Sequence, residues 1–205
     1  MGLMAQKPAW MRTHGRPWSR TSERRAFENP WLAVREYAAV APTGRAVTYG
    51  AVHFKNRAIA VLPLHDDGTV TLVGQNRFVF QDYSWEIPEG GGPLDENPLD
   101  AARRELREEC GLEAAEWTKV LEVQLSNSLT DEMAFGFLAT GLTEAETQPD
   151  ETEDLALVRV PFSEALEAAT AGFIKDALTV AMLLRLHHMA TKGELDDGLA
   201  ANVLG

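Results

Sequence analysis

Short runs of β-branched, aromatic and other apolar residues recur along the chain from residue 31 onward. Runs of this kind, bounded by Gly, Pro, Asp and Asn, predict β-strands. The tripeptides at 42–44 (PTG) and 66–68 (DDG) each separate two runs, which is typical of hairpins. The predicted strands are WLAVREY, AVTYGAVHF, RAIAVLPL, TVTLVGQ, WTKVLEVQL, MAFGFLAT and LALVRV.

Three other segments predict helices. In LDAARRELREEC, Asn97 suits the N-cap, Pro98 the first helical position and Gly111 the residue that ends the helix. SEALEAAT and a longer segment over about 175–190 predict two more. The Gly/Pro-rich segment EIPEGGGPLDENP before the first helix predicts a loop. This order of elements predicts one α+β domain, with helices packed on a mixed sheet.

The start of the chain lacks a clear hydrophobic period and is rich in Arg, Pro and Trp. It predicts a mobile N-terminal arm over residues 1–28, followed by a single domain over 29–205. The alternative is an anion-binding role for the arginines of this arm.

Composition narrows the possible functions. The chain has 205 residues and a net charge of −12, which argues against non-specific nucleic-acid binding. No apolar run approaches the roughly 20 residues that span a bilayer, and the N-terminus lacks the apolar segment of a secretory signal. A single cysteine, Cys110, excludes an internal disulfide and predicts a small buried residue. We therefore expect a cytoplasmic enzyme that acts on a small molecule, with no membrane or nucleic-acid partner.

Acidic residues cluster on the helix predicted around residues 97–110. Glu105, Glu108 and Glu109 stand at i, i+3 and i+4, and so share one face. An apolar stripe that docks the helix on the sheet lies beside them: Leu99, Ala102, Leu106 and Cys110. Partial burial strengthens the repulsion between the carboxylates, and a hard cation such as Mg²⁺ or Mn²⁺ would relieve it. Taken alone, the three glutamates also fit a solvated acidic helix.

The spacing of residues over a longer segment, which includes the three glutamates, favours a metal site over a solvated acidic helix. From Gly90 to Leu112 the chain matches GX5EX7REUXEEXGU, where U is aliphatic, at every position. This pattern is the Nudix box, and the chain resembles the Nudix hydrolases. The resemblance implies a mixed β-sheet sandwiched between helices, with an N-terminal strand extension. It also implies Mg²⁺- or Mn²⁺-dependent hydrolysis of a nucleoside diphosphate linked to another group.

The resemblance assigns roles to residues of the box. Glu105, Glu108 and Glu109 would supply metal ligands, and Glu89 would offer its backbone carbonyl. Arg104 would orient the glutamates, so that Arg104 and Glu108 count among the catalytic residues. The metals would neutralise phosphate charge and activate a water for attack at phosphorus.

Segments outside the box resemble the ADP-ribose pyrophosphatase branch of the family. That branch forms homodimers by exchanging N-terminal strands, here within residues 29–53. Trp31 and Tyr49 match the aromatics that sandwich the adenine, although each could instead pack on a sheet. Arg77, in GQNRF, matches an arginine that contacts the diphosphate, although it could instead be a surface residue.

The branch also carries a catalytic base in an acidic loop, which corresponds to QPDETEDLALV here. Glu151 and Glu153 match the family's paired acids, of which one is the base and one is an added metal ligand. Both are candidates for the base, and Glu153 is the candidate for the added ligand. Asp150 and Asp154 compete for these roles. Glu132, in SNSLTDE, could contact substrate ribose or metal, or face solvent. This segment lacks the proline that ADP-ribose enzymes carry some fifteen residues after the box, which leaves the exact substrate open.

The sequence therefore predicts a Nudix pyrophosphohydrolase that cleaves a nucleoside diphosphate sugar, with ADP-ribose giving AMP and ribose 5-phosphate. Another nucleotide sugar, such as GDP-mannose, is the alternative substrate. A non-catalytic module that senses a nucleotide is a third reading. The complete set of box glutamates argues against it, because a sensing module has no need of them.

Overall fold

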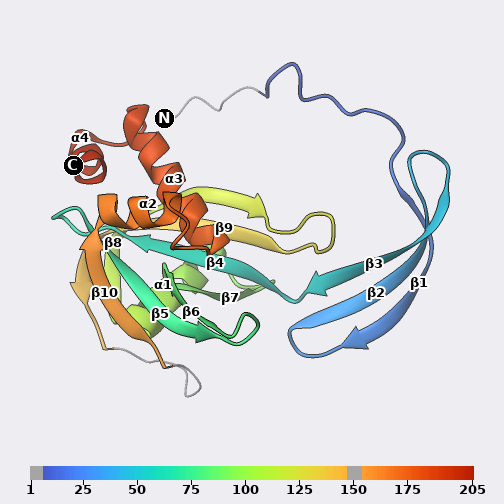
Figure 1. Cartoon of the computed structure of the whole chain (residues 1–205), viewed down its shortest axis with the longest axis horizontal. Coiled ribbons are helices and arrows are strands. Elements are labelled where there is room, and N and C mark those ends of the chain that lie inside the picture. Colours follow the sequence, from blue (N-terminus) through green and yellow to red (C-terminus); the bar gives the residue numbers. More distant parts are fainter. Residues whose placement is uncertain (1–6, 147–153) are drawn as a thin grey trace. The chain divides into compact units, whose positions relative to one another are not determined.

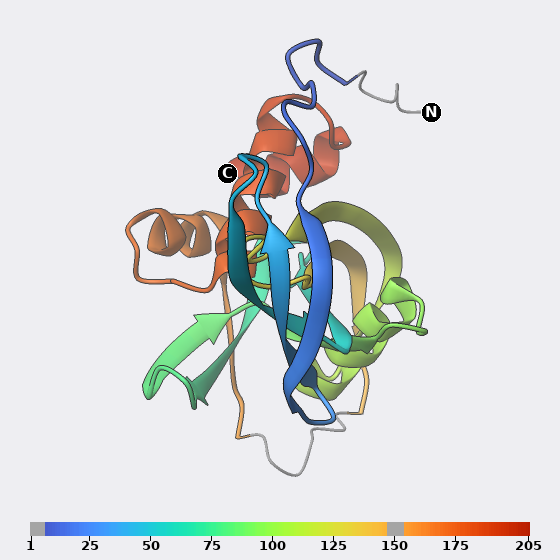
Figure 2. The same cartoon turned by 90° about the vertical axis from the view of Figure 1, so that its right-hand side faces the viewer.

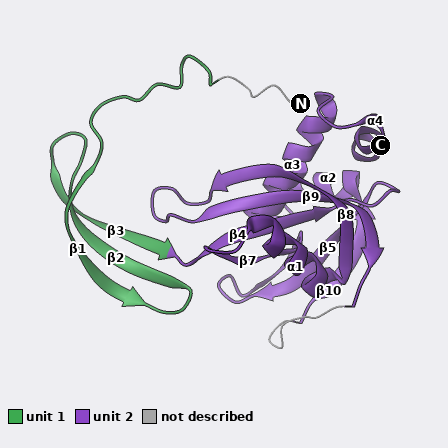
Figure 3. Ribbon diagram, turned by 180° about the vertical axis from the view of Figure 1, so that it is seen from behind, with its two compact units in different colours: residues 1–53 green, residues 54–205 purple. Residues whose placement is uncertain are grey.

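The computed structural model describes residues 7–146 and 154–205 of the chain (Figure 1). The chain divides into two compact units, Met1–His53 and Phe54–Gly205, here called unit 1 and unit 2 (Figure 3). The boundary lies 25 residues after the one predicted at residue 28. It coincides with the end of the segment 29–53, for which the resemblance implies an exchange between subunits, and the domain bounds and the exchange remain predictions.

Unit 1 contains a three-stranded sheet in the order β1-β2-β3, whose strands lie side by side in Figure 2. The strands are β1 (Ser19–Glu28), β2 (Leu32–Val40) and β3 (Ala46–Phe54). Strand β1 occupies much of the segment predicted as a mobile arm. Every residue of β1 is exposed, so no alternation of apolar and polar residues marks it in the sequence. Its pairing with β2 is antiparallel and includes ion pairs such as Arg24–Glu36 at 3.2 Å.

Unit 2 holds two sheets, of order β7-β4-β9-β8 and β10-β5-β6. The strands are β4 (Asn56–Pro63), β5 (Thr69–Arg77), β6 (Asp82–Glu86), β7 (Glu89–Pro93), β8 (Leu112–Gln124), β9 (Met133–Glu144) and β10 (Ala156–Pro161). The helices are α1 (Pro98–Cys110), α2 (Phe162–Thr170), α3 (Ala177–Thr191) and α4 (Asp197–Leu204). The first sheet is mixed, because β4 pairs parallel to β9 and antiparallel to β7.

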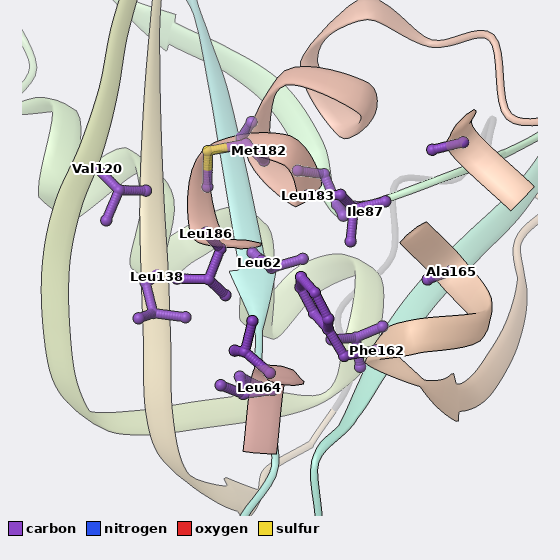
Figure 4. Close-up of a cluster of buried hydrophobic side chains, with 14 of the residues drawn as sticks. Leu62, Leu64, Ile87, Val120, Leu138, Phe162, Ala165, Met182, Leu183 and Leu186 are labelled. Carbon is purple, nitrogen blue, oxygen red and sulfur yellow. The ribbon is translucent and has the colours of Figure 1, made fainter. Parts of the chain in front are cut away.

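Strand β4 separates two hydrophobic cores. Ile59 and Val61 pack with the buried face of α1. Ala60 and Leu62 point the other way, into a core formed with α2, α3 and α4 (Figure 4). Because successive side chains of a strand alternate between its faces, a strand covered on both sides is apolar throughout. The predicted α+β arrangement, with a mixed sheet sandwiched between helices, is confirmed.

Helix α1 begins and ends where the sequence predicts. The Asn97 side chain accepts a hydrogen bond from the Leu99 N–H at 3.0 Å, and Gly111 ends the helix with a φ of 60°. The loop predicted before this helix is in part wrong. Its glycine-rich part, residues 89–93, forms β7 and pairs with β4 from Ala60↔Glu89 to Asn56↔Pro93. Backbone pairing alone makes this strand, since three consecutive glycines carry no side-chain pattern.

Candidate active site

The glycine run of β7 lies directly against the acidic face of α1. A Cβ atom added to Gly90 would lie 2.1 Å from the carboxyl carbon of Glu105. No side chain fits at position 90 while Glu105 keeps this place. The first glycine of the box is therefore required by the close approach of a carboxylate to the backbone.

Three glutamates are buried, two of them on α1 and the third, Glu86, at the end of β6. Glu86, Glu105 and Glu109 are 3%, 7% and 6% exposed, and they are the only charged residues in the buried class within the described part of the chain. Glu108, on the same face of α1, is half-buried. Buried carboxylates need cations or hydrogen-bond donors, because desolvation of a charge is costly.

Arg104 supplies part of that compensation. Its Nη1 donates to Glu105 Oε1 at 2.7 Å and to Glu108 Oε2 at 3.0 Å. Its Nη2 donates to the Gly91 carbonyl oxygen at 2.9 Å. One guanidinium thus binds two glutamates of α1 and a backbone carbonyl of β7.

Glu89 connects β7 to the third acid of the helix. Its backbone N–H donates to Glu109 Oε2 at 3.0 Å. Its side chain accepts a hydrogen bond from Thr179 Oγ1 at 3.3 Å. Burial, and then the charge and hydrogen bond of Asp176, raise the pKa of the Glu89 carboxyl well above its usual range. The sequence pointed only to the carbonyl of Glu89, whereas the structure adds an amide that holds Glu109.

Arg77, at the end of β5, is bound to a buried acid. Its Nε donates to both carboxylate oxygens of Glu86, at 3.0 Å each, and its Nη2 donates to Glu86 Oε2 as well. Its side chain remains 39% exposed. Sequence reasoning missed Glu86, the last residue of the β6 segment DYSWE, which no motif marks.

The chain matches the family model described as NUDIX domain over residues 54–179, more than half of its length. The chain belongs to the Nudix family. A relative in Mycobacterium tuberculosis named ADP-ribose pyrophosphatase is 33% identical over 167 residues, which cover 78% of each chain. One of the same name in Bacillus subtilis is 34% identical over 124 residues, 60% of this chain and 67% of the relative.

A solved structure described as an ADP compounds hydrolase has the same fold. It aligns with a TM-score of 0.79 and 19% identity, covering 90% of this chain and all of that one. The resemblance to the Nudix family and the Nudix fold predicted from the sequence are both confirmed. The Nudix match runs from Phe54 to Thr179, so it takes in the box and the first turn of α3.

The other residues expected in this Nudix site belong to unit 1, to the segment before β9, or to the loop before β10. Trp31 and Tyr49 belong to unit 1, where Trp31 is 65% exposed and Tyr49 packs edge-on against Trp18 with ring centroids 5.4 Å apart. Glu132 is half-buried just before β9, and burial followed by the charge of Asp131 raises its pKa.

The acidic loop before β10 is described only at its end. Asp150, Glu151 and Glu153 lie outside the described residues, while Asp154 is exposed two residues before β10 begins. The expected catalytic base and the added metal ligand therefore remain predictions.

The box glutamates offer the donors that a hard divalent cation prefers, as Nudix hydrolases generally require. Carboxylate oxygens of Glu105, Glu108 and Glu109 gather on one helix face, partly desolvated and beside a close-packed backbone. Within residues 7–146 and 154–205, no three Asp, Glu, His or Cys side chains converge as a ready-made cage. Arg104 and the Glu89 amide bind their oxygens instead. The donor chemistry fits the cation.

Proposed function

We propose that this Nudix pyrophosphohydrolase cleaves the diphosphate linkage of a nucleoside diphosphate sugar, with ADP-ribose as its principal substrate, giving AMP and ribose 5-phosphate. The observation that carries the proposal is the buried acidic face of α1. There Glu105 lies in close contact with Gly90, and Arg104 donates hydrogen bonds to both Glu105 and Glu108. The two relatives named ADP-ribose pyrophosphatase, at 33% and 34% identity, support the choice of substrate.

We infer that Mg²⁺ or Mn²⁺ is held by Glu105, Glu108 and Glu109, with the Glu89 carbonyl and Glu153 as further ligands. A bound ion of this kind neutralises phosphate charge and lowers the pKa of a water molecule. Arg104 keeps the carboxylates of Glu105 and Glu108 together.

Residues outside the box would act on the substrate. The Arg77 side chain is 39% exposed while Glu86 binds its guanidinium, and a guanidinium suits phosphate geometry, so we assign Arg77 to the diphosphate. Glu132 is proposed to contact the substrate ribose. Glu151 or Glu153 is proposed as the base that removes a proton from the attacking water.

GDP-mannose is the competing substrate. A relative named GDP-mannose pyrophosphatase in Salmonella arizonae is 34% identical over 100 residues, which cover 47% of this chain and 52% of the relative. This match is shorter than that of the ADP-ribose pyrophosphatase from M. tuberculosis, which spans 78% of both chains. The extent of the match therefore favours ADP-ribose.

A substrate panel tests the assignment. We expect kcat/KM for ADP-ribose to exceed that for GDP-mannose by at least roughly tenfold, since a base-contacting site discriminates through its polar groups. Chelation with EDTA should abolish turnover, and added Mg²⁺ should restore it. Product nucleotides separated by chromatography give both rates. Cleavage of GDP-mannose with ADP-ribose inert would replace the substrate, while hydrolysis that persists in EDTA would contradict the metal site.

We further propose that the enzyme is a homodimer in which unit 1 supplies Trp31 and Tyr49 to the adenine. In support, the buried hydrophobic residues among the described residues 7–53 of unit 1 are few: Ala33, Tyr37 and Ala39. Phe27 and Trp31 are 54% and 65% exposed. A partner subunit would bury such a surface.

A tryptophan substitution tests this arrangement. Because stacking on a base contributes about 1–3 kcal/mol, Trp31→Ala should raise KM for ADP-ribose about tenfold with little change in kcat. Trp10→Ala, at a residue that is 76% exposed, is the matched control. Light scattering should give twice the chain mass of 22.5 kDa. A monomer with unchanged KM in the Trp31 variant would contradict the proposal.

We propose a cytoplasmic location and a small-molecule substrate, without a nucleic-acid partner. The net charge of −12 supports the last point, because nucleic acid would be repelled. None of the helices in the described part of the chain is long and apolar enough to cross a membrane.

A further inference from the structure

The first turn of α3 reaches the linker between β6 and β7. Thr179 is completely buried, and its Oγ1 accepts a hydrogen bond from the Ile87 N–H at 3.0 Å. The same hydroxyl donates to Glu89 Oε1 at 3.3 Å. Asp176 caps the helix by accepting from the Thr179 N–H at 2.7 Å. One threonine therefore binds Ile87 in the linker and Glu89 at the start of β7, which lie 92 and 90 positions earlier in the chain.

The opposite side of this linker is also held. The Val61 N–H of β4 donates to the Pro88 carbonyl oxygen at 2.9 Å. The Glu89 N–H then donates to Glu109 Oε2 at 3.0 Å. Hydrogen bonds thus run from Thr179 to Glu89, and from Glu89 to a glutamate of the box.

The hydroxyl of Thr179 is needed for these hydrogen bonds and not for packing. It lies at the edge of the core that contains Ile87, Leu178 and Met182, where a valine of the same shape would satisfy packing alone. A buried hydroxyl is costly unless it is hydrogen-bonded, and here it serves as both donor and acceptor. β-branching restricts its χ1 angle, so the hydroxyl has a fixed direction.

We propose that Thr179 is a positioning residue for the metal-binding glutamates, acting through residues 87–89 on the carboxylate of Glu109. The inference rests on the proposed function, because it takes Glu109 as a metal ligand. Partners that orient the ligands of a metal contribute strongly to its affinity, although they do not touch the metal. The hydroxyl of α3 would fill that role here.

The proposal is tested by measuring the affinity of the full-length protein for Mn²⁺ in the absence of substrate. The electron paramagnetic resonance signal of the free ion reports how much Mn²⁺ is unbound. Thr179→Val removes the hydroxyl and keeps the shape, and it should weaken Mn²⁺ binding about 10–100-fold. Thr179→Ser keeps the hydroxyl and should bind within about twofold of the wild type. If Thr179→Val does not fold, Thr179→Cys replaces it, because a thiol of similar size is only a weak hydrogen-bonding group.

Leu186→Val is the matched control, because Leu186 is equally buried on α3 and belongs to the same core. It should lower the melting temperature without changing Mn²⁺ affinity. The proposal is overturned if the folded Thr179→Val protein binds Mn²⁺ as the wild type does, if Leu186→Val loses as much affinity, or if the wild type binds no Mn²⁺. A wild type that binds Mn²⁺ but leaves ADP-ribose intact would contradict the proposed substrate, and the role of Thr179 would stand.

Discussion

Glu109→Gln is expected to lower kcat by roughly 10³-fold while the protein remains folded. Glutamine has nearly the same shape, and its carbonyl oxygen still accepts the bond that the Glu89 N–H gives to Glu109 at 3.0 Å. The negative charge needed to hold a divalent ion is lost. Metal ions contribute several kcal/mol to such reactions, and about 1.4 kcal/mol corresponds to a factor of ten. Steady-state hydrolysis of ADP-ribose measures the loss, and circular dichroism checks the fold.

Glu116→Gln provides the comparison for this variant. Glu116 is exposed on β8, away from the acidic face of α1, so the same chemical change should leave kcat unaltered. If Glu109→Gln turned over substrate at the wild-type rate, the box would have no part in the mechanism.

Gly90→Ala should reduce kcat by about 10²-fold through displacement of Glu105. The added methyl group would stand 2.1 Å from the Glu105 carboxyl carbon and 2.2 and 2.3 Å from its two oxygens. Glu105 must then leave its place, and with it the bond to Arg104 at 2.7 Å. Disturbance of a metal site of this kind costs about 10–100-fold. Overpacking should also lower the free energy of unfolding by about 1–3 kcal/mol, measured by urea titration.

The neighbouring glycine is a close control for this substitution. A Cβ at Gly91 would meet only the Asn56 side chain, whose Nδ2 lies 3.0 Å away at the end of a flexible group. Gly91→Ala should therefore change stability by no more than about 0.5 kcal/mol. If Gly90→Ala and Gly91→Ala lost equal amounts of kcat and of unfolding free energy, the glycines would be needed for strand β7 as a whole. They would not be needed specifically for the position of Glu105.

Local signals explain what the sequence predicted well. Asn97, Pro98 and Gly111 delimit α1 through capping chemistry that depends only on adjacent residues, and the spacing of the box places its glutamates on one helix face. Runs such as RAIAVLPL indicate β4, because a strand covered on both faces must be apolar throughout. These features required no knowledge of distant contacts.

Features that depend on distant partners were missed. Strand β1 is exposed throughout and β7 consists largely of glycine, so neither has a side-chain period. Glu86 and Thr179 gain their significance from Arg77 and Glu89, and the second pair lies 90 residues apart. Only the folded chain shows that Thr179, in the first turn of α3, binds Glu89.

Strand β7 is also an edge of its sheet, since the order is β7-β4-β9-β8. An open edge with little side-chain bulk is a template on which a foreign strand could dock and start aggregation. Two arginines occupy its carbonyl groups: Arg57 binds the Pro93 oxygen at 3.2 Å, and Arg104 binds the Gly91 oxygen at 2.9 Å. The same guanidinium also binds Glu105 and Glu108, so a substitution of Arg104 that released these glutamates would at the same time uncover a carbonyl group on this edge.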